Sequence, residues 1–144
     1  MLDLIQEMQQ ELGMAVLLIT HDLGVVARVC QSVSVMYCGQ VVEEGLVGDL
    51  LEAPRHPYTA GLLGAMPRRG VRRRPTAVPG AVPAFDALPE GCRFHPRCTH
   101  AVAGRCDVPG AAEVLAVHSP TRSDRCLRSD ELGLSLRTEA GATG

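Results

Sequence analysis

The chain has 144 residues, of which 46% are apolar, and it contains two Phe, two Tyr and no Trp. So few aromatic rings exclude the stacking platform that holds single-stranded nucleic acid, and a net charge of −2 argues against a basic nucleic-acid binder. All 14 positively charged side chains are Arg, so the chain can supply neither a phosphate-loop lysine nor a Schiff base. Since no apolar run reaches roughly 18 residues, no membrane-spanning helix is predicted.

Charge and proline content divide the chain. Residues 1–67 carry two Arg and eight acidic residues, whereas residues 68–128 carry eleven Arg, five acidic residues and most of the prolines. The first part has the composition of regular structure and the second that of an irregular extension. We therefore predict an α/β part, an Arg- and Pro-rich linker, a Cys-bearing extension and a flexible tail, over residues 1–66, 67–91, 92–128 and 129–144.

The amino-terminal part has the pattern of an α/β unit. Apolar residues recur every three or four positions over residues 2–12, which predicts a helix that Gly13 would end. Residues 15–19 form a continuous apolar run, which predicts a strand covered on both faces, as in a parallel sheet. Asp22 would then cap a second helix that reaches about Cys30.

A hairpin and two short helices are predicted next. Residues 33–37 and 41–44 have the composition of paired strands, and short helices are expected over residues 48–52 and 58–66, the latter following Pro57. One buried strand cannot form a parallel sheet alone. The predicted fold class is therefore an α/β fragment. Either the fragment is part of a larger domain, or its strand pairs with a strand of another chain.

His21 is the first candidate functional residue, because it follows the apolar run and precedes a predicted helix. Ligands of open α/β sheets bind at this edge, where an imidazole can donate to a phosphate oxygen or orient a water molecule. The alternative is that His21 only contributes to the turn. One histidine at a strand end does not decide between these two interpretations.

The extension holds four of the six cysteines, separated by five, seven and nineteen residues: Cys92, Cys98, Cys106 and Cys126. Neither the paired knuckles of zinc fingers nor the closely spaced run of bacterial ferredoxins has this pattern. The acidic start of the chain has the wrong charge for an export signal, which disfavours disulfides. Spacing alone leaves a metal site, free thiols and disulfides open.

The remaining metal-binding residue types are assigned to other roles. Cys30 and Cys38 fall in the α/β part and are expected to be small core residues. Three histidines could in principle replace a cysteine ligand: His95, His100 and His118. Because four thiols suffice, we do not predict any of them as a ligand.

Three stretches of the α/β part resemble the ATPase domain of ABC transporters. Residues 18–23, Leu-Ile-Thr-His-Asp-Leu, and residues 35–45 are similar to its carboxyl end. Residues 54–63 contain His-Pro-Tyr-Thr, which resembles the signature of dipeptide and oligopeptide importer ATPases. The resemblance covers about residues 1–128 and implies that His21 is the switch histidine, which contacts the γ-phosphate and helps to position the attacking water.

The extension resembles the same family. Residues 91–98, Gly-Cys-Arg-Phe-His-Pro-Arg-Cys, are similar to the segment that follows the His-Pro-Tyr region in peptide-importer ATPases. That resemblance implies that four cysteines are the ligands of a [4Fe-4S] cluster: Cys92, Cys98, Cys106 and Cys126. Zinc is the alternative, because thiolates suit both. Four arginines flank these positions and would either offset the cluster's negative charge or lie on the surface: Arg93, Arg97, Arg105 and Arg125.

Parts of an ATPase are missing from this sequence. It contains no Gly-rich phosphate loop, no Leu-Ser-Gly-Gly-Gln signature and no Asp-Glu pair, which the family places upstream of the region that residues 2–5 resemble. Hydrolysis needs a phosphate cradle, a Mg²⁺ ligand and a group that orients water. We therefore expect the C-terminal portion of an ATPase subunit, unable to hydrolyse ATP alone, with ATP and Mg²⁺ bound only by the complete subunit.

The resemblance also implies partners and a location. The complete protein would act at the cytoplasmic face of the cell membrane with permease subunits, a companion ATPase subunit and, indirectly, a peptide-binding protein. Nucleic acid is not an expected partner under this interpretation. The alternative is a free-standing zinc-binding or regulatory module whose Arg-rich arm, residues 68–74, contacts nucleic acid.

Overall fold

The computed structural model describes residues 2–66 and 78–134. The chain divides into two compact units, residues 1–31 and residues 32–144, and each is described separately. The Arg run at 68–74 and the end of the predicted tail, residues 135–144, lie outside the described residues. Among the described residues, no helix combines the length and the apolar character that crossing a membrane requires.

The first unit contains two helices, as predicted. Helix α1 (Leu2–Leu12) ends at Gly13, whose φ of +62° lies in the left-handed region that favours glycine. Helix α2 (Leu23–Val29) is capped by Asp22, whose Oδ1 accepts from the backbone N–H of Gly24 at 2.8 Å and of Val25 at 3.2 Å. The C-terminal end of α1 and the N-terminal end of α2 are thus fixed by residues next to them in the sequence.

The predicted strand over residues 15–19 is wrong. These residues adopt no regular structure, and Leu17 and Ile19 are 89% and 91% exposed. A buried strand requires neighbours on both sides for its N–H and C=O groups and its side chains. Within the part of the chain that the structure describes, no strand pairs with this run.

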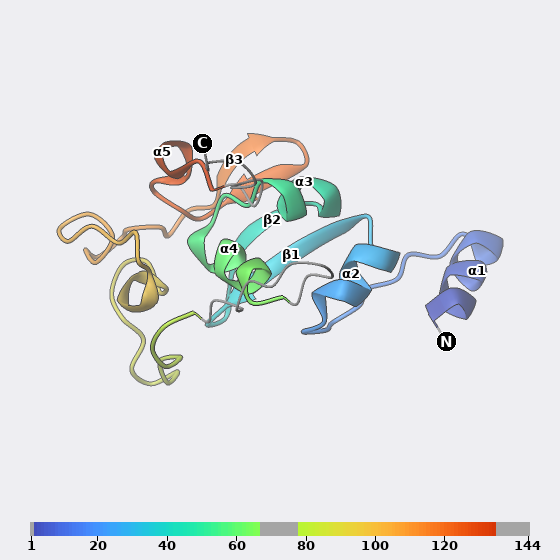
Figure 1. The fold of residues 1–144 in the computed structure, drawn as a ribbon, viewed down its shortest axis with the longest axis horizontal. Coiled ribbons are helices and arrows are strands. Elements are labelled where there is room, and N and C mark those ends of the chain that lie inside the picture. The colour runs from blue at the N-terminus through green and yellow to red at the C-terminus, as the bar shows by residue number, and fades with distance from the viewer. Residues whose placement is uncertain (1, 67–77, 135–144) are drawn as a thin grey trace, which may run out of the picture. The chain divides into compact units, whose positions relative to one another are not determined.

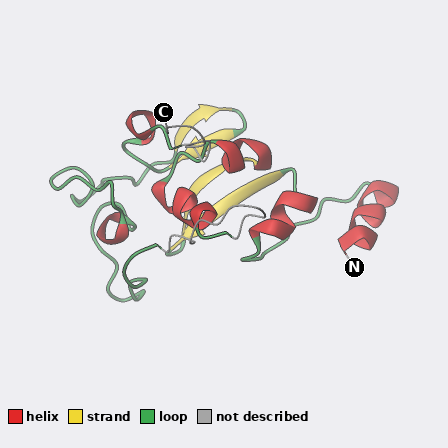
Figure 2. Ribbon diagram, in the orientation of Figure 1, coloured by secondary structure: helices red, strands yellow, loops and turns green. Residues whose placement is uncertain are grey.

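The second unit is built on a four-stranded sheet in the order β1-β2-β4-β3 (Figures 1 and 2). Its strands are β1 (Ser32–Tyr37), β2 (Gln40–Leu46), β3 (Ala116–Ser119) and β4 (Arg122–Asp124). The hairpin of β1 and β2 confirms the prediction, and Cys38 and Gly39 form its turn with φ of 46° and 77°. Every pairing in this sheet is antiparallel.

Short helices flank the sheet. Helices α3 (Val47–Glu52) and α4 (Pro57–Gly64) match the two predicted after the hairpin. The Nδ1 atom of His56 accepts from the backbone N–H of Tyr58 at 3.1 Å and so caps α4, while Pro57 occupies its first turn. A 3-10 helix, η1 (His95–Arg97), and helix α5 (Ser129–Leu132) complete the unit.

The extension shares a core with the hairpin. Phe94 is 3% exposed and packs with four buried residues of the hairpin and α3: Val35, Tyr37, Val42 and Leu50. Its ring stands edge-on to Tyr37, with centroids 5.2 Å apart, and lies 5.4 Å from that of Tyr58 in α4. Residues on both sides of the proposed linker thus form one hydrophobic cluster.

Two parts of the chain differ from their expected character. Strand β4 comes from the extension but pairs with β2 of the hairpin, with Glu43 opposite Asp124. The first residues of the predicted flexible tail form α5, in which Ser129 is buried. Both differences arise from contacts with residues that are distant in sequence. The four segment boundaries remain predictions.

Replacing Phe94 with Ala is expected to destabilise the second unit by about 3–5 kcal/mol, because it removes a buried ring and leaves a cavity in the shared core. Phe85, which is 79% exposed, provides the matched control, and Phe85→Ala should change the free energy of unfolding by no more than about 0.5 kcal/mol. Urea unfolding of both variants measures the difference. Equal losses would contradict the assigned core.

Candidate functional site

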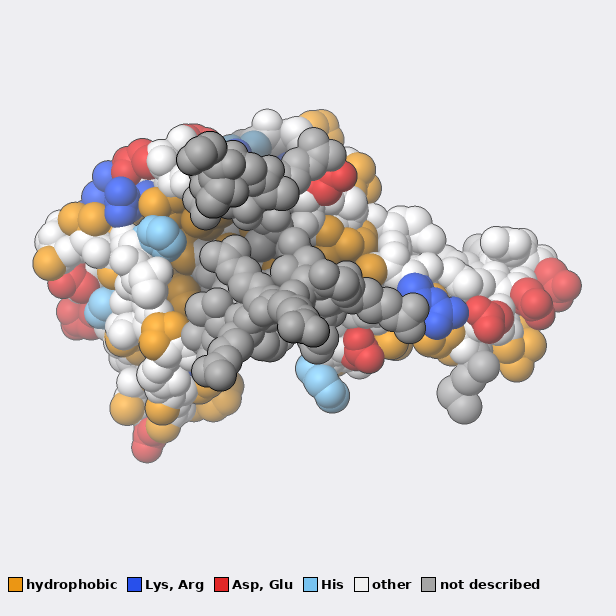
Figure 3. Space-filling model, in the orientation of Figure 1, with side chains coloured by type: hydrophobic (Ala, Val, Ile, Leu, Met, Phe, Trp, Pro, Cys, Tyr) orange, Lys and Arg blue, Asp and Glu red, His pale blue; other side chains and the backbone are white. Residues whose placement is uncertain are grey.

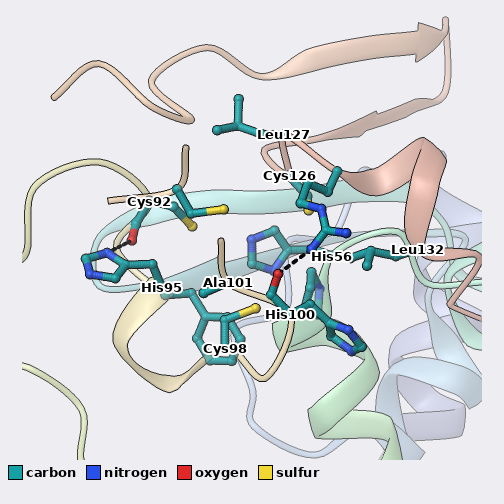
Figure 4. Close-up of a pocket in the computed structure, with 13 residues that line it drawn as sticks. His56, Cys92, His95, Cys98, His100, Ala101, Cys126, Leu127 and Leu132 are labelled. Atoms are coloured by element: carbon teal, nitrogen blue, oxygen red, sulfur yellow. Dashed lines mark hydrogen bonds between the residues drawn. The ribbon is translucent and has the colours of Figure 1, made fainter. Parts of the chain in front are cut away.

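The four cysteines of the extension line one pocket of the second unit (Figure 4). Cys92 and Cys98 lie on either side of η1, Cys106 lies in the loop between η1 and β3, and Cys126 follows β4. The remaining wall comes from residues of α4, the loops and α5, including Phe94 and Leu132. The cavity that they enclose has a volume of about 20 Å³. Cysteines up to 34 positions apart in the sequence thus line one pocket.

Backbone contacts bring the first three cysteines together. The N–H of Cys92 donates to the carbonyl of Cys106 at 2.9 Å, and that of Cys98 donates to the carbonyl of His95 at 3.1 Å. A side chain at Gly91 would place its Cβ 2.5 Å from the Cys106 carbonyl oxygen, and Gly91 has a φ of 72°. Only glycine permits this close approach without distortion.

Each cysteine sulfur receives a backbone N–H. The sulfurs of Cys92, Cys98 and Cys126 are each hydrogen-bonded by the N–H two residues further along, which belongs to Phe94, His100 and Arg128 respectively. The sulfur of Cys106 accepts from the N–H of Val102 at 3.5 Å. Such hydrogen bonds stabilise thiolates and set the potential of iron–sulfur clusters.

Without a bound cation, the thiols of Cys92, Cys98 and Cys126 are neutral near pH 7. Burial raises the pKa of Cys92 and Cys98 and raises that of Cys126 to about 12, although the backbone N–H groups oppose the shift. The neighbouring cysteines raise these pKa values further, because thiolates in one pocket repel each other. A polyvalent cationic centre reverses this balance by coordinating deprotonated thiols.

The structure bears on the disulfides and on the metal site that the spacing left open. All six cysteines are free in the structure, so none forms a disulfide. Over residues 2–66 and 78–134, no group of three or more His, Cys, Asp or Glu side chains is arranged to hold a metal ion. Thiolates suit both zinc and iron–sulfur clusters, so the donor type does not separate the two. Figure 4 shows Cys92, Cys98 and Cys126 spaced around the pocket.

The other candidate ligands are placed as follows. His95 Nδ1 lies 3.0 Å from the Cys92 carbonyl oxygen, and His118 Nε2 lies 2.5 Å from the carboxylate of Asp124. His100 lines the pocket beside the cysteines. Cys38 packs against the hydrophobic core, as predicted, and Cys30 is the half-buried C-cap of α2.

Beside the pocket, the fully buried carboxylate of Glu43 joins three segments. Its Oε1 accepts from the backbone N–H of Arg55 and from Nη2 of Arg122, each at 2.8 Å. Its Oε2 accepts from the backbone N–H of His56 at 3.0 Å. Glu43 therefore fixes the entry into α4 against β2 and β4.

The equally buried carboxylate of Asp124 connects this network to the cysteines. Its Oδ2 accepts from Nε of Arg55 at 2.8 Å, and Arg55 also pairs with Asp130. Its Oδ1 accepts from the backbone N–H of Cys126 at 2.9 Å. The position of the fourth cysteine is thus set by a carboxylate that is itself held by Arg55. Sequence spacing gave no signal for either buried carboxylate.

His56 forms part of the pocket wall and was not predicted as a site residue. It is 1% exposed, and its ring lies 5.8 Å from that of Phe94. Burial lowers the pKa of His56 to about 4, although the charge of Asp124 opposes this shift. Its imidazole is therefore neutral near pH 7 and accepts the Tyr58 N–H that begins α4.

None of the four arginines that flank the cysteines is among the residues that line the pocket. Arg93 donates to the carbonyl of Cys38, Arg97 to those of Pro79 and Val78, and Arg125 to those of Val41, Ala112 and Glu113. These three guanidinium groups hold loops together. Arg128, which the sequence had not singled out, lines the pocket instead.

His21 lies in the other unit. It is exposed and sits in a bend between the irregular run and α2, one residue before the helix cap. Thr20 and Asp22 shape this bend, since the N–H of Asp22 donates to the Thr20 hydroxyl at 3.0 Å. Its predicted role at the γ-phosphate stays a prediction.

Comparison with known proteins identifies the class. The model of the family described as "Oligopeptide/dipeptide transporter, C-terminal region" matches residues 42–106, which span β2, the His-Pro-Tyr segment and three of the four cysteines. The chain belongs to this family, as the sequence had predicted. It therefore corresponds to the C-terminal portion of a peptide-transporter ATP-binding protein.

The relatives carry names of that class. The chain is 47% identical over 139 residues to a putative peptide import ATP-binding protein of Brucella ovis, and 44% identical over 133 residues to oligopeptide transport ATP-binding protein AppD of Bacillus subtilis. It is 40% identical over 129 residues to oligopeptide transport ATP-binding protein OppD of Salmonella typhimurium. These alignments cover 91%, 92% and 89% of this chain but 40%, 40% and 37% of the relatives, so the chain spans about two fifths of their length.

The buried His56 predicts a pH dependence of stability. The unfolded chain binds a proton below the ordinary histidine pKa of about 6.5, whereas the folded chain does so only near pH 4. The contribution of His56 is therefore complete above about pH 6.5 and declines toward pH 4, by up to about 1.4 kcal/mol per pH unit.

His56→Asn tests this dependence, because asparagine offers an acceptor for the Tyr58 N–H but does not titrate. Urea unfolding from pH 8 to pH 4.5 should give a shallower decline for the variant than for the wild type. Parallel curves would show that His56 titrates normally in the folded protein.

Proposed function

We propose that the four cysteines hold a [4Fe-4S] cluster and that this chain is the C-terminal part of the ATP-binding subunit of a dipeptide or oligopeptide importer. The observation that supports the cluster most directly is that four thiols line one pocket and that each sulfur receives a backbone N–H. The family match and the names of the relatives support the assignment to the subunit.

The residues present fit such a group in two respects. Four thiols satisfy its ligand number, and no other side chain is needed as a ligand. When bound, the cluster supplies four iron–sulfur bonds that tie the loop of Cys92, Cys98 and Cys106 to Cys126. The protein contributes orientation through Gly91 and Asp124, and it provides a wall of buried side chains from Phe94 and His56.

The proposed role of the cluster is structural. Residues 92–115, all of which the structure describes, are mostly loop: their one regular element is η1. Side chains from this segment that enter the hydrophobic cluster include Phe94, with Cys92 and Cys98 packed against it. A segment with few apolar contacts gains order when cross-links shorten its loops. The site would therefore hold the extension against the His-Pro-Tyr segment.

We assign ATP chemistry to the complete subunit. There, His21 would act as the switch histidine that contacts the γ-phosphate, while ATP and Mg²⁺ would be bound by segments beyond those in this sequence. The complete subunit would pair with a companion ATPase and bind permease subunits at the cytoplasmic face of the membrane. A peptide-binding protein would deliver the substrate. The names of the relatives support this coarse assignment, since they describe peptide import and ATP binding.

Replacing any one of the four pocket cysteines with Ser is expected to abolish the cluster's broad visible absorbance and to lower bound iron after anaerobic reconstitution, because one iron loses its thiolate. The double variant Cys30→Ser/Cys38→Ser provides the control, since these residues lie outside the pocket. Iron and acid-labile sulfide analysis quantify the loss. A colourless wild-type protein that binds one zinc ion would contradict the proposed cluster.

Replacing His21 with Ala in the complete subunit, assembled with its partners, is expected to lower ATP turnover by about 100-fold or more while ATP binding persists, because the group that orients the water is lost. Val114→Ala is the control, since Val114 is 81% exposed and lies outside the cysteine pocket. Phosphate release and nucleotide binding are measured on the same preparations. Normal turnover by His21→Ala would contradict the switch role.

A further inference from the structure

Two arginines bridge the opposite sides of the cysteine pocket. Nη1 of Arg128 donates to the carbonyl of His100 at 2.6 Å, and this bond is the dashed line between the labelled His100 and the guanidinium in Figure 4. Nη2 of Arg105 donates to the carbonyl of Leu127 at 3.1 Å. His100 follows Cys98 by two residues and Leu127 follows Cys126 by one. Each arginine therefore reaches from one cysteine-bearing loop to the other.

Glu131 holds both arginines. Its Oε2 accepts from Nε of Arg128 at 2.8 Å, and its Oε1 lies 2.7 Å from Nη2 of Arg105. Glu131 belongs to α5, which places it three residues after Arg128 and on the same side of that turn. Basic and acidic side chains lie next to each other on the surface beside α5 in Figure 3. The three side chains form a clasp, defined here as Arg105, Glu131 and Arg128.

Arg128 is also the arginine that lines the cysteine pocket, and its side chain is 23% exposed. By contrast, the guanidinium groups of Arg93 and Arg125 are engaged by carbonyl oxygens of the hairpin and the loops.

We propose that Arg128 is the cation that faces the iron–sulfur cluster and that the clasp closes the pocket around it. This inference rests on the cluster proposed above. Four thiolates give the site a net negative charge, so a held guanidinium stabilises the reduced, more negative state of the cluster and raises its reduction potential. Arg128 ties the loop of Cys98 to that of Cys126 through the His100 carbonyl, and Glu131 links Arg128 to Arg105. The clasp therefore also slows the opening through which iron leaves.

The test uses the full chain, reconstituted anaerobically with ferrous iron and sulfide. Three variants separate charge from bridging: Arg128→Gln removes both, Arg128→Lys keeps the charge but loses the planar fork, and Glu131→Gln keeps Arg128 but weakens its anchor. Arg93→Gln is the matched control. It also removes one arginine from the extension, but the guanidinium of Arg93 bonds to the Cys38 carbonyl and does not line the pocket. Iron release to a chelator and dithionite titration are followed by visible absorbance.

Arg128→Gln should release iron about 10-fold faster than the wild type and shift the reduction potential to a more negative value. Arg128→Lys should keep the wild-type potential but release iron faster, and Glu131→Gln should also accelerate release. Arg93→Gln should match the wild type in both measurements.

Two results would overturn the inference in different ways. A brown wild-type protein in which Arg128→Gln and Arg93→Gln behave alike would remove the role of Arg128 while leaving the cluster in place. A wild-type chain that takes up neither iron nor sulfide would contradict the proposed cluster itself. If Arg128→Gln fails to fold by circular dichroism, Glu131→Gln decides: unchanged iron release would contradict the clasp.

Discussion

Two buried carboxylates that face each other across β2 and β4 set the arrangement of the second unit. Glu43 and Asp124 are both fully buried, and each is paired with an arginine, Arg122 and Arg55 respectively. Removing one partner of a buried pair leaves an uncompensated charge, which typically costs about 3–5 kcal/mol. Because Arg55 bonds both carboxylates, through its backbone N–H and its side chain, strand pairing and the entry into α4 depend on each other.

The elements predicted correctly from the sequence are those whose cause is local. The helix at α1 follows from apolar spacing, α2 from the Asp22 cap, and the hairpin from paired apolar runs around a Cys38-Gly39 turn. The prediction for residues 15–19 was wrong because a strand requires a partner strand that is distant in sequence. An apolar run indicates a preference for burial but does not show that such a partner is present. Strand β4 was missed for the converse reason: Arg-Ser-Asp has no strand-like composition, and the Glu43–Asp124 network with Arg55 and Arg122 fixes it.

The site was recoverable from the sequence only in part. Resemblance to a family grouped the four cysteines, and the pocket brings those four together. Adjacency in sequence misled for the arginines, because neighbours of a ligand in an irregular loop can point in any direction. Arg93 and Arg97 bond to carbonyl oxygens of the turn and of the loop before η1, whereas Arg128 reaches the pocket only because α5 and Glu131 turn it there.

The two sequence motifs of this chain, the His-Pro-Tyr segment and the cysteine segment, are physically one assembly. The ring of His56 caps α4, packs against Phe94 and forms part of the wall of the cysteine pocket. The backbone N–H of the same residue donates to Glu43. A change in the pocket therefore reaches the start of α4 through one imidazole. Conversely, a movement of α4 relative to the sheet would displace His56 from the wall of the pocket. Because His56 is 1% exposed and closely packed, water cannot take its place without loss of that packing. A structural centre at the cysteines would thus hold the His-Pro-Tyr segment in a single position.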